Sequence, residues 1–127
     1  MGRRIIETEQ APAAIGPYSQ GVLAGGTLFT AGQIGLDPAT GALVPDGAAA
    51  EARRALVNLS AVVEAAGLSL ADVAKATLYL VDMADFKVVN EVYAGFFAEA
   101  PPARAAVQVA ALPLGARVMI DLIVVAS

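Results

Sequence analysis

The alternation of apolar and polar positions divides the first half of the chain into a hairpin and a long helix. Short apolar runs at 20–24 and 27–31 flank Gly25-Gly26, a pair that favours a tight turn between antiparallel strands. The segment 32–47 is rich in glycine, proline and aspartate and predicts an ordered loop. From 48 to 66 apolar residues recur at helical spacing, and a glycine directly afterwards ends the helix. The expected buried face of this helix holds Ala52, Leu56, Leu59, Val63 and Ala66.

The second half of the pattern predicts three more strands and a second helix. Strands are expected at 74–81, 104–110 and 117–125, and a helix is expected at 85–98. The elements together predict an α+β fold, with a mixed sheet that carries two helices on one face, and a single domain over residues 1–127. The second helix has an apolar stripe of Phe86, Val89, Tyr93 and Phe96. The last strand should place Val118, Ile120, Leu122 and Val124 on one face, and Arg117, Met119, Asp121, Ile123 and Val125 on the other.

The chain is more apolar than one small core requires. Hydrophobic residues make up 57% of its 127 residues, and the mean hydropathy is +0.66. A chain of this length buries only about two-thirds of its unfolded surface, so the excess predicts contacts with other copies of itself. No apolar run is long enough for a transmembrane helix, and Glu7 and Glu9 follow the N-terminal arginines too closely for a signal peptide. A cytoplasmic location is therefore expected.

Charge and residue usage exclude several kinds of chemistry. The net charge is −4, and the eight Lys and Arg residues are scattered, so no basic stripe is available for nucleic acid. The chain has no cysteine and no histidine, which removes disulfides, thiolate nucleophiles, imidazole bases and the usual zinc ligands. We therefore expect no metal site, and any reaction must depend on the remaining polar side chains, the backbone and water.

Arg104 is the first candidate for a binding residue. It lies at the start of an otherwise apolar predicted strand, two residues after the end of the stiff pair Pro101-Pro102. A guanidinium can hold a carboxylate through two parallel N–H···O bonds, and a fixed strand start would aim that fork in advance. The alternative is an arginine in an ordinary surface ion pair, which by itself is the commoner situation.

Seven distinctive segments occur along the chain, at 11–20 (APAAIGPYSQ), 31–34 (AGQI), 37–41 (DPATG), 64–67 (EAAG), 82–86 (DMADF), 89–93 (VNEVY) and 102–104 (PAR). In this order and at this spacing, they resemble the RidA (YjgF) family of reactive-intermediate deaminases. The resemblance covers nearly the whole chain and implies a fold like that of bacterial chorismate mutase, assembled as a homotrimer with pockets between subunits. It also implies hydrolysis of enamine and imine acids, such as 2-aminoacrylate, to 2-oxo acids and ammonia without a cofactor. The expected partner is thus a small carboxylate-bearing imine, enamine or 2-oxo acid.

The resemblance assigns roles to five residues of this chain. Arg104 would hold the substrate carboxylate, and Tyr18 would offer a phenol to the ligand; these two are the expected catalytic residues. Gly32 matches a backbone donor beside the pocket, Asn90 a polar residue of the second helix, and Phe86 an apolar wall. Other roles are open for three of them: Tyr18 as an interface aromatic, Asn90 in a local hydrogen bond, and Phe86 in the helix core.

Three positions depart from the family pattern by losing a polar side chain. Ala31 replaces a usual serine, Ala106 a usual cysteine or threonine, and Met119 a glutamate that helps to hold the attacking water. Ala106 and Met119 are still expected to line the substrate pocket. Asp121, about 7 Å from Met119 along the strand, is a conceivable substitute for the glutamate, but we expect it to pair with Arg117 or to contact another copy.

Two functions from different classes follow from these departures. The first is a RidA-like deaminase that is weakened or redirected to another imine or carbonyl substrate. The second is a non-catalytic trimer that binds small carboxylates, which needs the arginine but no ordered water. Members of the family have also been described as ribonucleases, but a chain with no histidine and an acidic balance gives that activity little support.

Overall fold

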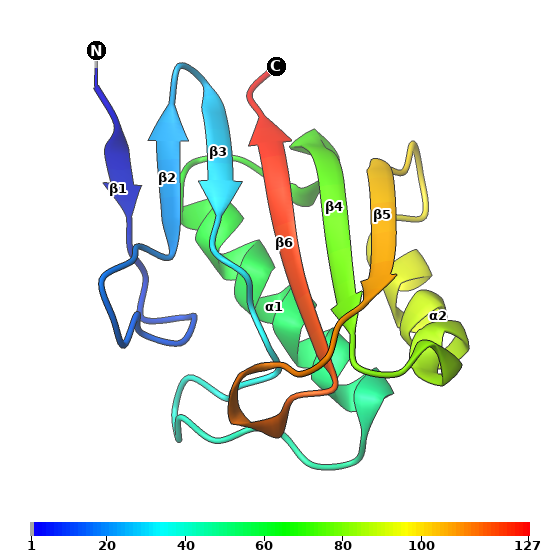
Figure 1. The fold of residues 1–127 in the computed structure, drawn as a ribbon. Helices are drawn as coiled ribbons and strands as arrows, with labels where there is room; N and C mark the ends of the chain where they lie inside the picture. The colour runs from blue at the N-terminus through cyan, green and yellow to red at the C-terminus, as the bar shows by residue number, and fades with distance from the viewer. Residues whose placement is uncertain (1) are drawn as a thin grey trace.

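A six-stranded sheet backed by two helices forms the frame of the protein in the computed structural model, which describes residues 2–127 (Figure 1). The strand order is β1-β2-β3-β6-β4-β5, and within it β4 and β5 are parallel while the other neighbours are antiparallel. The helices are α1 (Ala48–Ala65) and α2 (Phe86–Phe96). The strands are β1 (Arg4–Ile6), β2 (Gly21–Ala24), β3 (Thr27–Thr30), β4 (Val73–Leu80), β5 (Ala103–Gln108) and β6 (Val118–Val125). Three 3₁₀ turns are η1 (Leu70–Asp72), η2 (Met83–Asp85) and η3 (Pro113–Gly115).

The predicted α+β architecture is confirmed, with one strand missed. The hairpin turn has positive φ at both Gly25 (58°) and Gly26 (82°), as a primed two-residue turn requires. The helix expected at 85–98 is shorter, because the η2 turn precedes it and it ends at Phe96. β1 was not predicted; it has three residues, and only Ile6 among them is buried, so no alternation marks it in the sequence.

The two faces of the sheet have different surroundings. Both helices cover one face, and the side chains of β6 predicted to point inward are fully buried there, with exposures of 0–1%. No element covers the opposite face in residues 2–127, as Figure 1 shows, and we call it the open sheet face. Several large apolar side chains on this face are 37–51% exposed. They account for part of the high apolar content of the sequence. They are Ile5, Phe29, Val107, Ile123 and Val125.

Buried polar side chains hold the long loops against the sheet and helices through hydrogen bonds. Gln20, only 3% exposed, accepts a hydrogen bond from the Thr8 amide (2.7 Å) and donates to three carbonyls of the loop before β2, including that of Pro12 (2.8 Å). Asn58 of α1 donates to the Leu36 carbonyl (2.9 Å), which holds the 32–47 loop. Each of these bonds gives a side-chain partner to a partly or fully buried backbone group of an irregular loop.

Gly35 lies where that loop crosses α1, and it predicts a sharp stability difference. A Cβ there would sit 2.7 Å from Glu51 Cα and 2.8 Å from Glu51 O, both backbone atoms that cannot turn away. We expect Gly35→Ala to lower the free energy of unfolding by about 1–3 kcal/mol in urea titrations. Gly95→Ala is the matched control, because a Cβ added at Gly95 of α2 would have no atom within 4 Å, and the variant should gain roughly 1 kcal/mol. Equal effects of the two substitutions would contradict the close approach.

Candidate functional site

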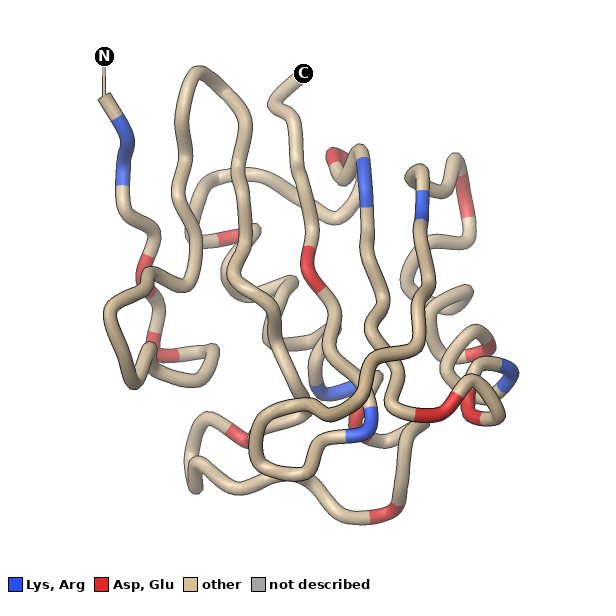
Figure 2. Tube along the Cα trace, in the orientation of Figure 1, with Lys and Arg blue, Asp and Glu red and all other residues tan. Residues whose placement is uncertain are grey.

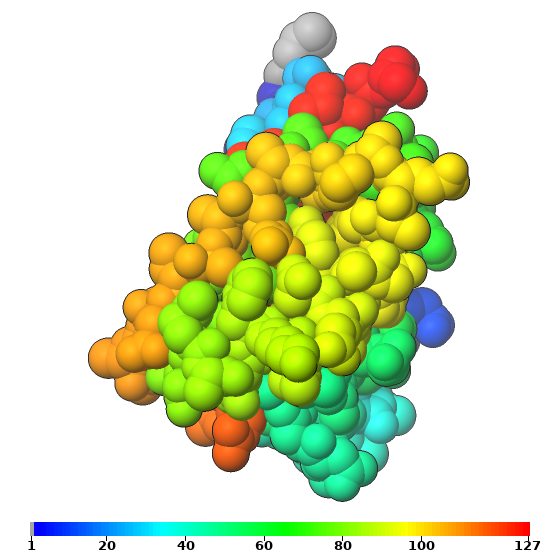
Figure 3. Space-filling model, turned by 90° about the vertical axis from the view of Figure 1, so that its right-hand side faces the viewer, coloured from blue at the N-terminus to red at the C-terminus, as the bar shows by residue number. Residues whose placement is uncertain are grey.

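Arg104 lies at the edge of the sheet and faces α2. β5 begins at Ala103, directly after Pro101-Pro102 and one residue before the predicted start, and it ends at Gln108, two residues before the predicted end. Arg104 is paired in parallel register with Ala76, whose side chain is fully buried beneath the helices, so the two side chains lie on the same face of the sheet. Figure 3 shows β5 (orange) and α2 (yellow-green) side by side along this edge.

Three side chains of α2, those of Phe86, Asn90 and Tyr93, surround the Arg104 guanidinium, and we call them with Arg104 the Arg104 group. Nη1 donates a hydrogen bond of 2.6 Å to Asn90 Oδ1, and Cζ lies 5.3 Å from the ring centre of Phe86 and 4.9 Å from that of Tyr93. Both ring distances fall within the range of cation–π attraction. Among the described residues no carboxylate lies within 4.0 Å of this guanidinium, so the ordinary ion pair is not formed. Within residues 2–127, one of the five N–H donors of Arg104 has a hydrogen-bond acceptor, and the other four can donate to an anion.

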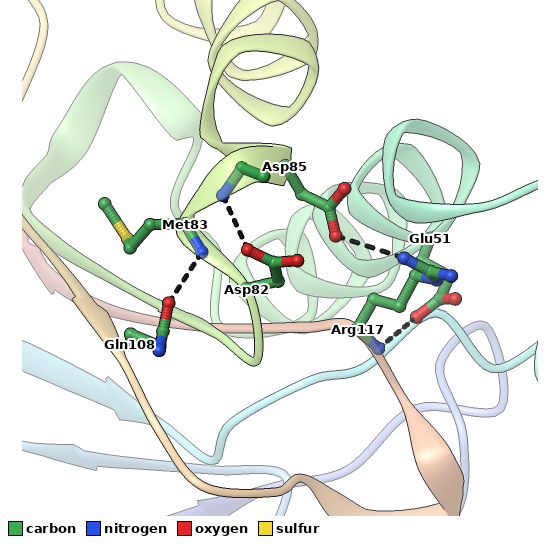
Figure 4. Close-up of polar contacts among 7 residues, drawn as sticks. Glu51, Asp82, Met83, Asp85, Gln108 and Arg117 are labelled. Atoms are coloured by element: carbon green, nitrogen blue, oxygen red, sulfur yellow. Dashed lines mark hydrogen bonds and ion pairs between the residues drawn. The ribbon is translucent and has the colours of Figure 1, made fainter.

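The junction between β5 and α2 is held by a set of polar contacts (Figure 4). Gln108, at the end of β5, accepts a hydrogen bond from the Met83 amide (2.8 Å), and Asp82 accepts one from the Ala84 amide (2.9 Å). Arg117 donates from its side chain to Asp85 (3.3 Å) and from its amide to the buried Glu51 (2.8 Å). These contacts fix the start of α2 against the sheet, and with it the position of Asn90 relative to Arg104.

Gly32 and Met119 form a second group, on the other face of the sheet. Met119 pairs in register with Tyr79, which alternates with the buried Leu78 and Leu80 and so faces the open side. Gly32 lies against Met119: a Cβ at this position would be 2.6 Å from Met119 Sδ. The amide of Gly32 has no hydrogen-bond partner within residues 2–127, as a backbone donor for a ligand requires. Ala31 precedes it, with its own amide bonded to the Gln20 carbonyl (2.9 Å).

Tyr18 lies at the far end of the sheet from Arg104. It belongs to the loop between β1 and β2 that Gln20 holds, whereas β5 is the strand at the opposite edge. Its side chain is 51% exposed and borders a hollow of about 660 Å³. Within one copy of the chain, therefore, the predicted site residues separate into the Arg104 group, the Gly32 and Met119 group, and Tyr18.

Ala106 belongs with Arg104, whereas the predicted pairing of Asp121 with Arg117 is wrong; the alternative, a contact of Asp121 with another copy, stays a prediction. Ala106 faces the same side as Arg104 and packs against the core. Arg117 precedes the start of β6, so strand alternation does not direct its side chain, and it reaches Asp85. Asp121 instead accepts a hydrogen bond from the Tyr79 hydroxyl (2.9 Å) on the open sheet face.

This contact gives Tyr79 an altered titration. Burial, and then the hydrogen bond and negative charge of Asp121, raise the pKa of Tyr79 above 10.0, against a smaller lowering by Thr77. A raised pKa in the folded state stabilises the protein below about pH 10, and this stabilisation is lost as the pH rises through the folded pKa.

We expect Asp121→Asn to lower the pKa of Tyr79, because the substitution removes the negative charge while burial persists. Phenolate absorbance titrations, with Tyr79→Phe in each background to isolate the Tyr79 signal, measure the change. An unchanged pKa would show that Asp121 does not act on Tyr79.

One residue of the Arg104 group was not predicted from the sequence. Tyr93 was assigned only to the apolar stripe of α2, and it is indeed 5% exposed. Burial raises the pKa of Tyr93, and the charge of Arg104 opposes this in part. The sequence feature that could have identified Tyr93 is its spacing: it follows Asn90 by three residues and Phe86 by seven, so all three lie on one face of the helix.

Charge is dispersed over the molecule. Figure 2 shows Lys and Arg spread among acidic residues along the trace. Within residues 2–127, no helix is both long and apolar enough to cross a membrane, and no three His, Cys, Asp or Glu side chains gather as metal ligands.

Fold and site together define a small α+β protein in which side chains of α2 hold an arginine at the sheet edge. Residues 8–126 match the family model described as Endoribonuclease L-PSP. The 2-iminobutanoate/2-iminopropanoate deaminase of Bos taurus is 54% identical over 97% of this chain and 90% of its own length. The RidA structure from an Antarctic Psychrobacter has 48% identity and a TM-score of 0.93, covering 96% of this chain and 98% of its own. Escherichia coli TdcF with bound serine has 46% identity and a TM-score of 0.94, covering 98% and 99%.

The chain therefore belongs to the family described as Endoribonuclease L-PSP, which includes the RidA and YjgF proteins.

Proposed function

We propose that this protein hydrolyses small 2-imino acids, and their enamine tautomers, to 2-oxo acids and ammonia. Water adds to the C=N carbon and the C–N bond breaks, so that the imine and one water give one 2-oxo acid and one ammonia. The observation that carries the proposal is the Arg104 guanidinium, fixed by Asn90 and two rings while most of its donors have no protein partner. Relatives named 2-iminobutanoate/2-iminopropanoate deaminase support the choice of reaction.

Binding of the carboxylate by Arg104 would contribute most of the orientation. A bidentate contact fixes both position and rotation of a small acid, and a substrate so held presents its imine carbon to water in a reactive geometry. The serine bound by the TdcF relative also carries a carboxylate. No cofactor is needed, because a protonated imine is itself electrophilic.

We propose that the complete site forms between copies in a homotrimer. Tyr18, Gly32 and Met119 would come from one copy, and Arg104, Asn90, Phe86 and Ala106 from its neighbour. Two observations support this: the groups lie on different faces and edges of one sheet, and the open sheet face carries large exposed apolar side chains. Light scattering should then give three times the chain mass of 12.8 kDa.

The rate should be lower than in relatives that retain the usual polar side chains. Met119 offers a thioether at the position that matches a water-holding glutamate, and Ala106 and Ala31 offer only methyl groups. Loss of a general base commonly costs about 10²–10⁴ in rate. The Gly32 amide and the Arg104 guanidinium do not depend on these side chains, and they would account for the remaining activity.

The same apolar replacements support a second candidate, a trimer that binds small carboxylates without converting them. Arg104 and its α2 partners suffice for binding, whereas Met119 contributes nothing to the activation of water. A ribonuclease activity, despite the description of the family model, has less support, because the chain has no histidine and its cations are dispersed.

One assay separates these candidates. Ammonia and 2-oxo acid are followed after 2-iminopropanoate or 2-iminobutanoate is generated in place by an amino-acid oxidase, with and without the protein. Acceleration over the buffer rate supports the deaminase. No acceleration, together with saturable binding of 2-oxobutanoate by calorimetry, would favour the binding protein.

A further inference from the structure

The ring of Tyr93 lies beneath the guanidinium of Arg104. Its centre is 4.9 Å from Arg104 Cζ, closer than the ring of Phe86 at 5.3 Å. The two rings and Asn90 project from one face of α2, so the helix presents two aromatic groups and one hydrogen-bond acceptor to a single cation. An arginine on the exposed edge strand has by itself no reason to hold one orientation.

Tyr93 is the rigid member of this group. Its side chain is 5% exposed and packs on Phe97, with ring centres 4.7 Å apart, whereas Phe86 is only half-buried. The buried Tyr93 hydroxyl has no hydrogen-bond partner among the described residues. Its contact with Arg104 is therefore made by the ring face, a contact that phenylalanine would reproduce and an aliphatic side chain would not.

We propose that Tyr93 is a positioning residue for Arg104, whose ring keeps the guanidinium oriented toward the substrate carboxylate. Asn90 fixes one nitrogen of the guanidinium, and the Tyr93 ring fixes the plane, so that the remaining donors point away from α2. The proposal rests on the proposed function, in which Arg104 binds the carboxylate. Preorganisation of this kind improves affinity by reducing the ordering cost of binding.

The test compares Tyr93→Leu, Tyr93→Met and Tyr93→Phe, with Phe97→Leu as the matched control. Phe97→Leu disturbs the same aromatic pair but leaves the ring under Arg104. We expect the two aliphatic variants at 93 to raise KM for 2-iminobutanoate by roughly 2- to 30-fold, the range of one cation–π contact, with kcat little changed. Tyr93→Phe should leave KM close to the wild-type value, because it keeps the ring. Phe97→Leu should lower the free energy of unfolding without raising KM.

An NMR signal provides a readout that does not need catalysis. The Nε–H of Arg104, assigned by its loss in Arg104→Lys, should be shifted upfield by the ring in the wild-type protein and in Tyr93→Phe, and less so in Tyr93→Leu. Absence of this shift in the wild-type protein, or an equal rise of KM in Phe97→Leu, would overturn the proposal. If the wild-type protein has no deaminase activity, the proposed function fails, while the NMR shift and the Kd of 2-oxobutanoate still decide the role of Tyr93.

Discussion

Arg104→Ala should abolish nearly all acceleration of 2-imino acid hydrolysis. Each hydrogen bond to a charged group contributes about 1.5–3 kcal/mol, and the substitution removes two from the carboxylate. The expected loss in kcat/KM is therefore roughly 10²- to 10⁴-fold, measured by ammonia release with imine generated in place. Stability should change little, because the Arg104 side chain is exposed.

Arg53→Ala is the control for this loss. Arg53 is also exposed, but it lies on α1, away from β5, and makes no ion pair among the described residues. Its substitution should leave kcat/KM within about 2-fold, a change expected of an exposed position. If Arg104→Ala retained the wild-type rate, the carboxylate would have to be bound elsewhere, and the assignment of the site to this sheet edge would be wrong.

Met119→Glu should have the opposite effect and raise the deaminase rate by about 10²-fold or more, the contribution of a general acid or base. The Met119 side chain is half-buried on the open sheet face, against Gly32, where a carboxylate of similar length can be accommodated. Addition of Ala106→Thr should increase the gain if both lost polar groups limit the reaction. The measurement is kcat for 2-iminobutanoate in the single and double variants.

Met83→Glu is the matched control for added charge. Met83 lies in η2 with 41% exposure and contributes only its amide to the junction with β5. Its substitution should not increase kcat. No gain in Met119→Glu, with an active wild-type protein that depends on Arg104, would show that position 119 is not where the attacking water is held.

The fold was largely predictable because its elements follow from local patterns. The stripe of Leu56, Leu59 and Val63 and the alternation of β6 mark buried faces directly, and the turn at Gly25-Gly26 needs positive φ, which glycine supplies. β1 was missed because three residues with one buried side chain form no pattern. The role of Gln20 could not be predicted either, since its partners are carbonyls of an irregular loop.

Several residues of the Arg104 group could be selected from the sequence, but the contact of Tyr93 and the arrangement of the candidate site could not. Motif resemblance selected Arg104 and Asn90, and the hydrogen bond between them is observed. Spacing along the chain could not show that Met119 and Arg104 face opposite sides of the sheet, because this depends on the order of β6, β4 and β5. The pairing of Asp121 was wrong for the same reason: its partner, Tyr79, lies on a neighbouring strand 42 positions away in sequence.

The placement of Arg104 and Met119 on opposite faces of the sheet also affects which substitutions such a protein can accept. The Arg104 group, made by β5 and α2, and the group of Gly32 and Met119 lie on opposite faces of the sheet within one chain. Under the proposed function, substitutions at Gly32 and Met119 can therefore accumulate while affinity for the substrate carboxylate persists. For design, the same separation allows positions 31, 32 and 119 to be substituted without changing the residues around Arg104. Each of the two groups can therefore be redesigned separately.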